Sequence, residues 1–205
     1  MKTKHILIFI CILTLLTSVG CMGAAKNKVY INPNVNFRFI KKVAVLPFEN
    51  LSTDRFADKK VRDIFVTTLL ASEFVDVPEL GDILQVMNTI GIDQGQNGFN
   101  SQPLKSTATI GKETARALGQ GLGVQGIILG SVEEYSVIRS TSGSFPEVSI
   151  TLRMIDPKTG SIIWAVSHTE QGGRILPSIL GVGEETLTET AMKASKNIVD
   201  TLVYK

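Results

Sequence analysis

The chain has 205 residues, 43% of them hydrophobic and 20% charged, which is ordinary for one globular domain or at most two. Its 21 lysines and arginines nearly balance 19 aspartates and glutamates, so it lacks the basic excess that nucleic-acid-binding proteins carry. Two cysteines and two histidines are too few for a disulfide framework or a cysteine-based zinc site. We therefore expect a globular protein that binds no nucleic acid and no metal.

The first 21 residues have the parts of an export signal. Residues 1–5 are short and basic, and residues 6–16 form an unbroken apolar run that is too short to span a bilayer. Small residues then precede Cys21, in an order that resembles the bacterial lipobox. This resemblance implies that residues 1–20 are a lipoprotein signal peptide. Its removal takes away Lys2 and Lys4 and leaves a formally neutral chain.

The same resemblance implies that the thiol of Cys21 carries diacylglycerol and that its amino group carries a third acyl chain. Each buried methylene contributes roughly 0.8 kcal/mol, so such an anchor is effectively permanent. Met22 follows, where an aspartate would favour the inner membrane, and we therefore expect the periplasmic side of the outer membrane. The alternative is ordinary secretion, with cleavage after Ala25 and loss of Cys21. We expect no cofactor besides this covalent lipid.

The rest of the chain divides into a lead-in and one domain. Residues 21–41 begin with the cysteine that the lipobox resemblance implies is lipidated. They mix glycine, asparagine, proline and lysine without helical periodicity, which predicts an extended tether. Phe37, Phe39 and Ile40 could add an edge strand. Residues 42–205 are predicted to form the domain, and its first strand, residues 42–48, is apolar on both faces as in a covered sheet.

The periodicity of apolar residues predicts the elements of this domain. Helices are predicted at residues 55–71, 80–90, 109–118 and 187–202, further strands at 74–77, 125–138, 147–155 and 161–168, and loops at 91–108 and 169–183. The order β-α-β-α-loop-α-β-β-β-α predicts an α/β (α+β) fold, in which a mixed β-sheet is packed with about four helices.

Two motifs could indicate catalysis, and we interpret both as structural. Residues 121–126 match G-x-G-x-x-G, but a helix precedes them and a strand follows, which is the reverse of a nucleotide-binding loop. We expect these glycines to end a helix. His168 ends a predicted strand beside Ser167 and near Glu170, and strand neighbours point to opposite faces. We expect His168 to be a surface or edge residue, and the protein not to be an enzyme.

One loop segment, residues 174–183, is unusually apolar for its place between glycines. It contains Ile175, Leu176, Ile179 and Leu180. Two interpretations stay open: a loop folded over the core, or an exposed contact for a partner or a membrane.

Three stretches together resemble the CsgG and TolB-amino-terminal-like superfamily. They are the opening strand at residues 43–52, the glycine-valine pattern and apolar strand at 118–132, and the hairpin at 152–163. The resemblance covers about residues 42–203. It implies a CsgG-like envelope domain without enzymatic chemistry, in a family that includes the curli secretion-channel subunit CsgG and LpoB, an activator of a peptidoglycan synthase.

We therefore expect a membrane-anchored lipoprotein whose periplasmic domain binds or assembles a cell-envelope partner, with homo-oligomerisation left open. The alternatives are a subunit of a CsgG-type, curli-like outer-membrane secretion channel and an LpoB-like activator. The channel subunit crosses the membrane with two hairpins, each of roughly 20 residues or more. The corresponding segments here, residues 139–146 and 169–183, are shorter, so we expect no pore.

Overall fold

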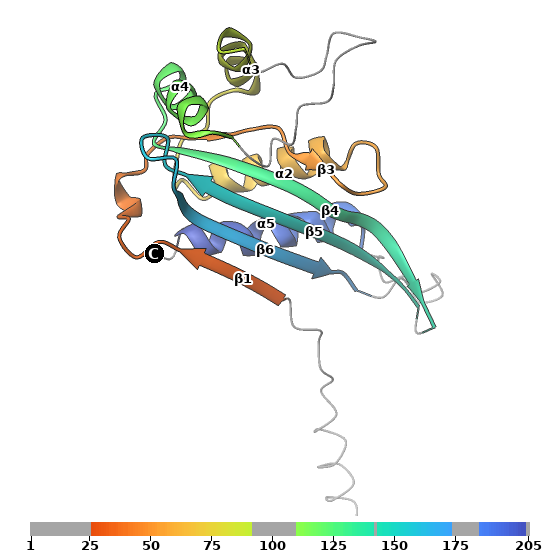
Figure 1. Ribbon diagram of the computed structural model, residues 1–205. Helices are drawn as coiled ribbons and strands as arrows, with labels where there is room; N and C mark the ends of the chain where they lie inside the picture. Colours follow the sequence, from red (N-terminus) through yellow and green to blue (C-terminus); the bar gives the residue numbers. More distant parts are fainter. Residues whose placement is uncertain (1–25, 92–109, 142, 174–184, 204–205) are drawn as a thin grey trace, which may run out of the picture.

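The computed structural model describes residues 26–91, 110–141, 143–173 and 185–203, which form one mixed sheet with helices on both faces (Figure 1). The described strands are β1 (Lys26–Ile31), β2 (Val43–Val45), β3 (Glu49–Asn50), β4 (Gly126–Ser140), β5 (Gly143–Ile155) and β6 (Ile162–Gln171). The described helices are η1 (Phe37–Phe39, 3-10), α2 (Ala57–Ala71), α3 (Leu80–Thr89), α4 (Lys112–Leu122) and α5 (Leu187–Val203). The predicted α/β (α+β) class is confirmed.

The sheet order is β1-β6-β5-β4-β2, and β3 also pairs with β4. β1, β6, β5 and β4 are antiparallel neighbours, whereas β2 and β3 run parallel to β4. A parallel neighbour requires a crossover, and the chain supplies it with α2, α3 and α4 between β3 and β4. The antiparallel strands need only hairpins, so β4, β5 and β6 follow one another directly.

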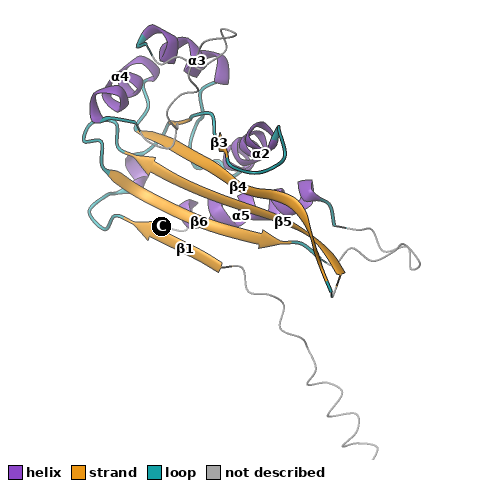
Figure 2. Ribbon diagram, turned by 45° about the vertical axis from the view of Figure 1, so that its right-hand side comes forward, coloured by secondary structure: helices purple, strands orange, loops and turns teal. Residues whose placement is uncertain are grey.

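Helices cover the two faces of the sheet unequally (Figure 2). α2 and α5 pack on one face, over inward residues of β4, β5 and β6 such as Ile128, Ile150 and Trp164. α3 and α4 cover the other face only around β2 and the start of β4, where they enclose Leu46 and Ile127. Strand β2 is therefore buried on both sides, as its continuous apolar sequence predicts, whereas β5 and β6 alternate between apolar and polar residues.

The predicted tether is wrong where it covers residues 26–31, because these residues form β1, the edge strand beside β6. β1 exposes most of its side chains and contributes little to the core, so no apolar pattern marks it. The strand predicted around Phe37, Phe39 and Ile40 is wrong as well. Residues 37–39 form η1, which buries Phe37 and leaves Phe39 76% exposed.

The strand predicted at residues 74–77 is reduced to one bridge, between Lys42 and Asp76. Its cause is the short neighbour: β2 has three residues, and Asp76 uses its backbone N–H and carbonyl on Lys41 and Val43. The strands predicted at 125–138 and 147–155 are longer than expected. They pair as far as Ser140 and Gly143, so the segment between them is the end of one continuous hairpin.

Helix α4 begins at Lys112, after its N-cap Gly111, which is later than predicted. It also ends later, because glycine does not stop it at residue 119. At Gly121 a Cβ atom would lie 2.7 Å from Cγ1 of Val86, so this glycine allows α3 and α4 to pack closely. The helix ends at Leu122 and is capped by Gly123, whose φ of 64° is left-handed. The predicted structural role of the glycine motif, with a helix before it and a strand after it, is confirmed.

Candidate docking surface

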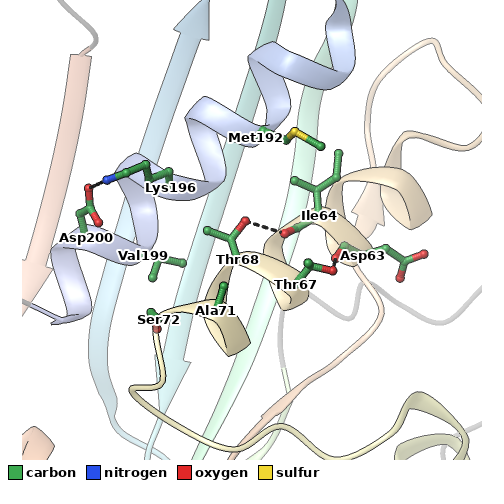
Figure 3. A pocket seen from close by; sticks show the side chains of 10 residues that line it. All are labelled: Asp63, Ile64, Thr67, Thr68, Ala71, Ser72, Met192, Lys196, Val199 and Asp200. Atoms are coloured by element: carbon green, nitrogen blue, oxygen red, sulfur yellow. Dashed lines mark hydrogen bonds and ion pairs between the residues drawn. The ribbon is translucent and has the colours of Figure 1, made fainter.

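A groove of about 650 Å³ lies between α2 and α5 on the side of these helices that faces away from the sheet (Figure 3). We call it the α2–α5 groove. Met192 and Ile64 lie towards one end and Val199 and Ala71 towards the other. Its lining residues are Asp63, Ile64, Thr67, Thr68, Ala71, Ser72, Met192, Lys196, Val199 and Asp200.

The groove stays open because the facing side chains are small. α2 presents threonine, alanine and serine along the turn from Thr67 to Ser72, and these do not fill the space between two helix backbones. Val199 forms part of the floor and is buried, whereas Met192 at the rim is 53% exposed. Leu70, on the outer side of α2, is 46% exposed. The surface thus combines a hollow with nearby apolar side chains.

Most polar groups in the lining already have partners within the chain. The hydroxyls of Thr67 and Thr68 donate to carbonyls one turn earlier, each at 2.8 Å, and Ser72 donates to the Leu69 carbonyl at 2.6 Å. Nζ of Lys196 lies 2.6 Å from Oδ2 of Asp200. Covering these groups would break no bond to the protein and would leave few of them without a partner. The groove therefore suits apolar side chains.

One carboxylate at the groove, that of Asp63, remains largely in solvent. Its side chain is 74% exposed, and its nearest cation is Nη1 of Arg62 at 3.5 Å. That guanidinium is turned inward, where Nη2 donates to the Val45 carbonyl at 2.7 Å and Nε lies 3.3 Å from the Leu46 carbonyl. Burial lowers the pKa of Arg62. Asp63 thus gives the rim an acidic group that a partner could meet with a cation.

A second polar cluster is buried under α5 and includes His168. The ring is 0% exposed, so the prediction of a surface or edge histidine is wrong. Its Nδ1 bonds Oδ1 of Asn27, and its Nε2 lies 2.9 Å from Oε2 of Glu170, which also accepts a bond from Asn197. Residues two apart on a strand share a face, which brings His168 and Glu170 together beneath the helix.

The His168 cluster joins β1, β6 and α5. Both ring nitrogens are occupied and the ring is closed to solvent, so its contacts are those of a structural crosslink. Within the described ranges, no group of three or more histidine, cysteine, aspartate or glutamate side chains is arranged to hold a metal ion. None of the helices in the same ranges is long and apolar enough to cross a membrane.

The site residues predicted from the sequence lie outside the described residues. Cys21 precedes β1, and Ile175, Leu176, Ile179 and Leu180 fall between β6 and α5. These predictions remain predictions. The α2–α5 groove was not predicted, although the sequence holds a signal: Met192 and Val199 form a second apolar stripe on α5, beside the stripe that faces the sheet.

No family model matches the chain, and no curated protein matches it. Among solved structures, the PelC dodecamer from Paraburkholderia phytofirmans is 16% identical, with 87% of this chain and 97% of that chain covered and a TM-score of 0.56. The lipoprotein GNA1162 from Neisseria meningitidis is 16% identical, with 78% of this chain and 99% of that chain covered and a TM-score of 0.51. The LpoB C-terminal domain from Salmonella enterica is 12% identical, with 63% of this chain and 81% of that chain covered and a TM-score of 0.45.

These comparisons define the fold. The chain shares the architecture of PelC and of the lipoprotein GNA1162 over most of its length. The likeness to the LpoB domain is too weak to support an argument. The resemblance to the CsgG and TolB-amino-terminal-like superfamily stays a prediction, because no family model matches the chain.

Proposed function

We propose that this protein is a lipid-anchored, non-enzymatic component of the bacterial cell envelope that binds a protein partner through the α2–α5 groove. Lipid on Cys21 would hold it at the periplasmic side of the outer membrane. The export signal, the cysteine that follows it and the fold shared with the lipoprotein GNA1162 support the anchor. The observation that carries the binding proposal is an open apolar groove whose polar groups are mostly bonded already.

The partner element that fits this groove best is an amphipathic helix. Two helices side by side form a trough along their axes, and a third helix packs into such a trough when small residues allow close approach. Ala71 and Ser72 provide these small residues. Asp63 at the rim favours a lysine or arginine beside the apolar stripe of the partner, since rim charges orient a docked partner more than they tighten it.

The anchor is tested by labelling growing cells with radioactive palmitate. Cys21→Ser should abolish labelling and release the protein into the soluble fraction. Cys11→Ser is the matched control, because Cys11 lies in the apolar run of the signal and should be dispensable. Unchanged labelling of the Cys21→Ser variant would refute the anchor.

The groove is tested by placing a photo-crosslinking amino acid at Thr67 in cells. We expect one discrete protein adduct, which Ala71→Arg should remove and which should map to a helix with a basic residue beside an apolar stripe. The control position is Glu113 on α4, an exposed site far from the groove. No adduct at Thr67, or equal adducts at both positions, would contradict the proposal.

Self-assembly is the second candidate function, because the solved PelC whose fold this chain shares is a dodecamer. The partner in the groove would then be another copy of this chain. Sedimentation of the purified lipoprotein distinguishes the two: a stable oligomer that Ala71→Arg dissociates favours self-assembly, and a monomer excludes it. The secretion-channel and peptidoglycan-synthase alternatives have no structural observation in their favour and stay predictions.

A further inference from the structure

The β4–β5 hairpin projects beyond the rest of the sheet at the end where β1 begins (Figure 1). β1 starts at Lys26, which pairs with Thr169, and Thr169 pairs with Ser149 of β5. β5 begins at Gly143, six positions before Ser149, and is paired with β4 over this stretch. At about 3.4 Å per residue, the hairpin extends roughly 20 Å past the level of Lys26.

This distance matches the reach of the chain that precedes β1. Lys26 lies five positions after Cys21, and a fully extended chain of that length spans at most about 18 Å. If Cys21 carries lipid, as proposed above, the start of β1 lies no further than this from the membrane surface. A hairpin that projects about as far from the same end of the sheet then reaches the membrane itself.

The side chains near the end of the hairpin suit such a surface. Val137 is 42% exposed, and Ile138 and Phe145 are half-buried where helices no longer cover the strands. Arg139 is exposed, and residues 137–146 contain no aspartate or glutamate. Apolar side chains of interfacial segments bury into the boundary between headgroups and acyl chains, and arginine binds phosphate oxygens with two parallel donors.

The hairpin also gains from a second surface. A two-stranded ribbon alone in water is marginally stable. The β4–β5 residue pairs of the tip lie beyond Gln171, the last residue of β6, which pairs with Glu147. The acidic residues of this region, Glu133, Glu134 and Glu147, are set back towards the body of the sheet. Negative charge and apolar character are therefore separated along the hairpin, with the acid-free part outermost.

We propose that the hairpin tip, formed by Val137, Ile138, Arg139 and Phe145, is a second and non-covalent membrane contact that lies in the phospholipid headgroup layer beside the lipid anchor. The proposal rests on lipidation of Cys21. It makes the domain a two-point attachment with a fixed orientation, in which the β5–β6 turn at the opposite end points away from the bilayer.

The contact is tested with the full-length lipidated protein in vesicles of three parts phosphatidylethanolamine and one part phosphatidylglycerol. A fluorophore is attached to Ser140→Cys at the tip or to Phe39→Cys, the control. Phe39 lies beside the β5–β6 turn at the other end of the sheet and is 76% exposed. The introduced thiol is then the free one, since Cys11 is removed and Cys21 is modified. A lipid that carries a quencher in its headgroup should quench the tip label at least threefold more than the control.

A tip variant and a flotation measurement separate the membrane contact from the lipid anchor. Adding Ile138→Asp to the tip-labelled protein should reduce the quenching to the control level while the protein still floats with the vesicles. Flotation without preferential quenching at the tip would overturn the membrane contact and leave the anchor standing, whereas failure to float would overturn the anchor. A photo-crosslinker at Ser140 that captures a protein in cells, together with absent quenching, would assign the tip to a protein partner and overturn the proposal.

Discussion

His168 and Asn27 are hydrogen-bonded across the outermost strand pair of the sheet, through Nδ1 of the ring and the side-chain oxygen of the amide. β6 lies under α5, whereas β1 is an edge strand with exposed side chains, so this bond ties a weakly packed strand to the core. Asn27→Ala should cost about 1 kcal/mol and speed hydrogen exchange at Lys28 and Tyr30. Lys28→Ala, on the opposite face of β1, is the control and should leave exchange unchanged.

Removal of His168 itself should be more severe. His168→Ala leaves a cavity and takes a partner from the partly buried carboxyl of Glu170, which together should lower the free energy of unfolding by about 3 kcal/mol, measured by urea titration. Loss of function in this variant would therefore reflect instability. A stability equal to that of the unmodified protein would contradict the crosslinking role.

Arg62 should stabilise the end of β2 through its bonds to the Val45 and Leu46 carbonyls. Arg62→Ala should cost roughly 3 kcal/mol in urea unfolding, because it leaves these buried acceptors unsatisfied. Arg62→Lys should recover part of this loss, since one ammonium cannot reproduce the geometry of the guanidinium. Lys59→Ala, at an exposed position of α2, is the control. Equal stability of Arg62→Ala and Lys59→Ala would refute the assignment.

Gly121 and Val86 should show energetic coupling across the α3–α4 contact. Gly121→Ala would place Cβ 2.7 Å from Cγ1 of Val86, and the resulting overpacking should exceed the gain in helix propensity by about 1 kcal/mol. In a protein that already carries Val86→Ala, Gly121→Ala should lower the free energy of unfolding by less than it does in the unmodified protein. Gly81→Ala in α3 meets nothing within 4 Å and should not destabilise. Additive effects at Gly121 and Val86 would contradict close packing there.

Glu185 should add a pH-dependent component to stability. Partial burial by itself raises the pKa of this carboxyl, but bonds from Lys193, Gly173 and Thr190 outweigh it and hold the pKa below the ordinary 4.5. Because the folded-state pKa is depressed, the stabilisation is present above about pH 4.5 and is lost as the pH falls through the folded value. The free energy of unfolding, measured by urea titration at several pH values, should therefore fall less between pH 7 and pH 3 in Glu185→Gln than in the unmodified protein. Glu113→Gln, on the exposed surface of α4, should retain the full acid slope.

The elements with strong apolar periodicity were predicted correctly from the sequence. α2, α3 and α5 follow the apolar spacing within two residues at each end, and β5 and β6 follow the alternation of their inward side chains. These elements bury a continuous face, so their pattern is the physical reason that they form. The predicted order of helices and strands also gives the class of the fold.

The features that were missed depend on tertiary contacts. β1 is mostly exposed, so its sequence carries no burial pattern, and its pairing with β6 is visible only in three dimensions. His168 is buried because α5 closes over β6, and a histidine at a strand end does not reveal this. The groove arises where the small residues of α2 meet the second stripe of α5, which are more than 100 residues apart in the chain.

The early start of β1 also determines how freely the domain can search for a partner. With β1 paired, a lipid on Cys21 would leave a connection of five positions, and the domain would stay close to its point of attachment in the bilayer. Unpairing β1 alone would free the chain up to η1 at Phe37 and lengthen the connection between Cys21 and the domain to sixteen positions, or about 55 Å at full extension. The six residue pairs of β1 thus set the length of chain between the anchor and the domain, and the Asn27–His168 bond helps to keep that length short.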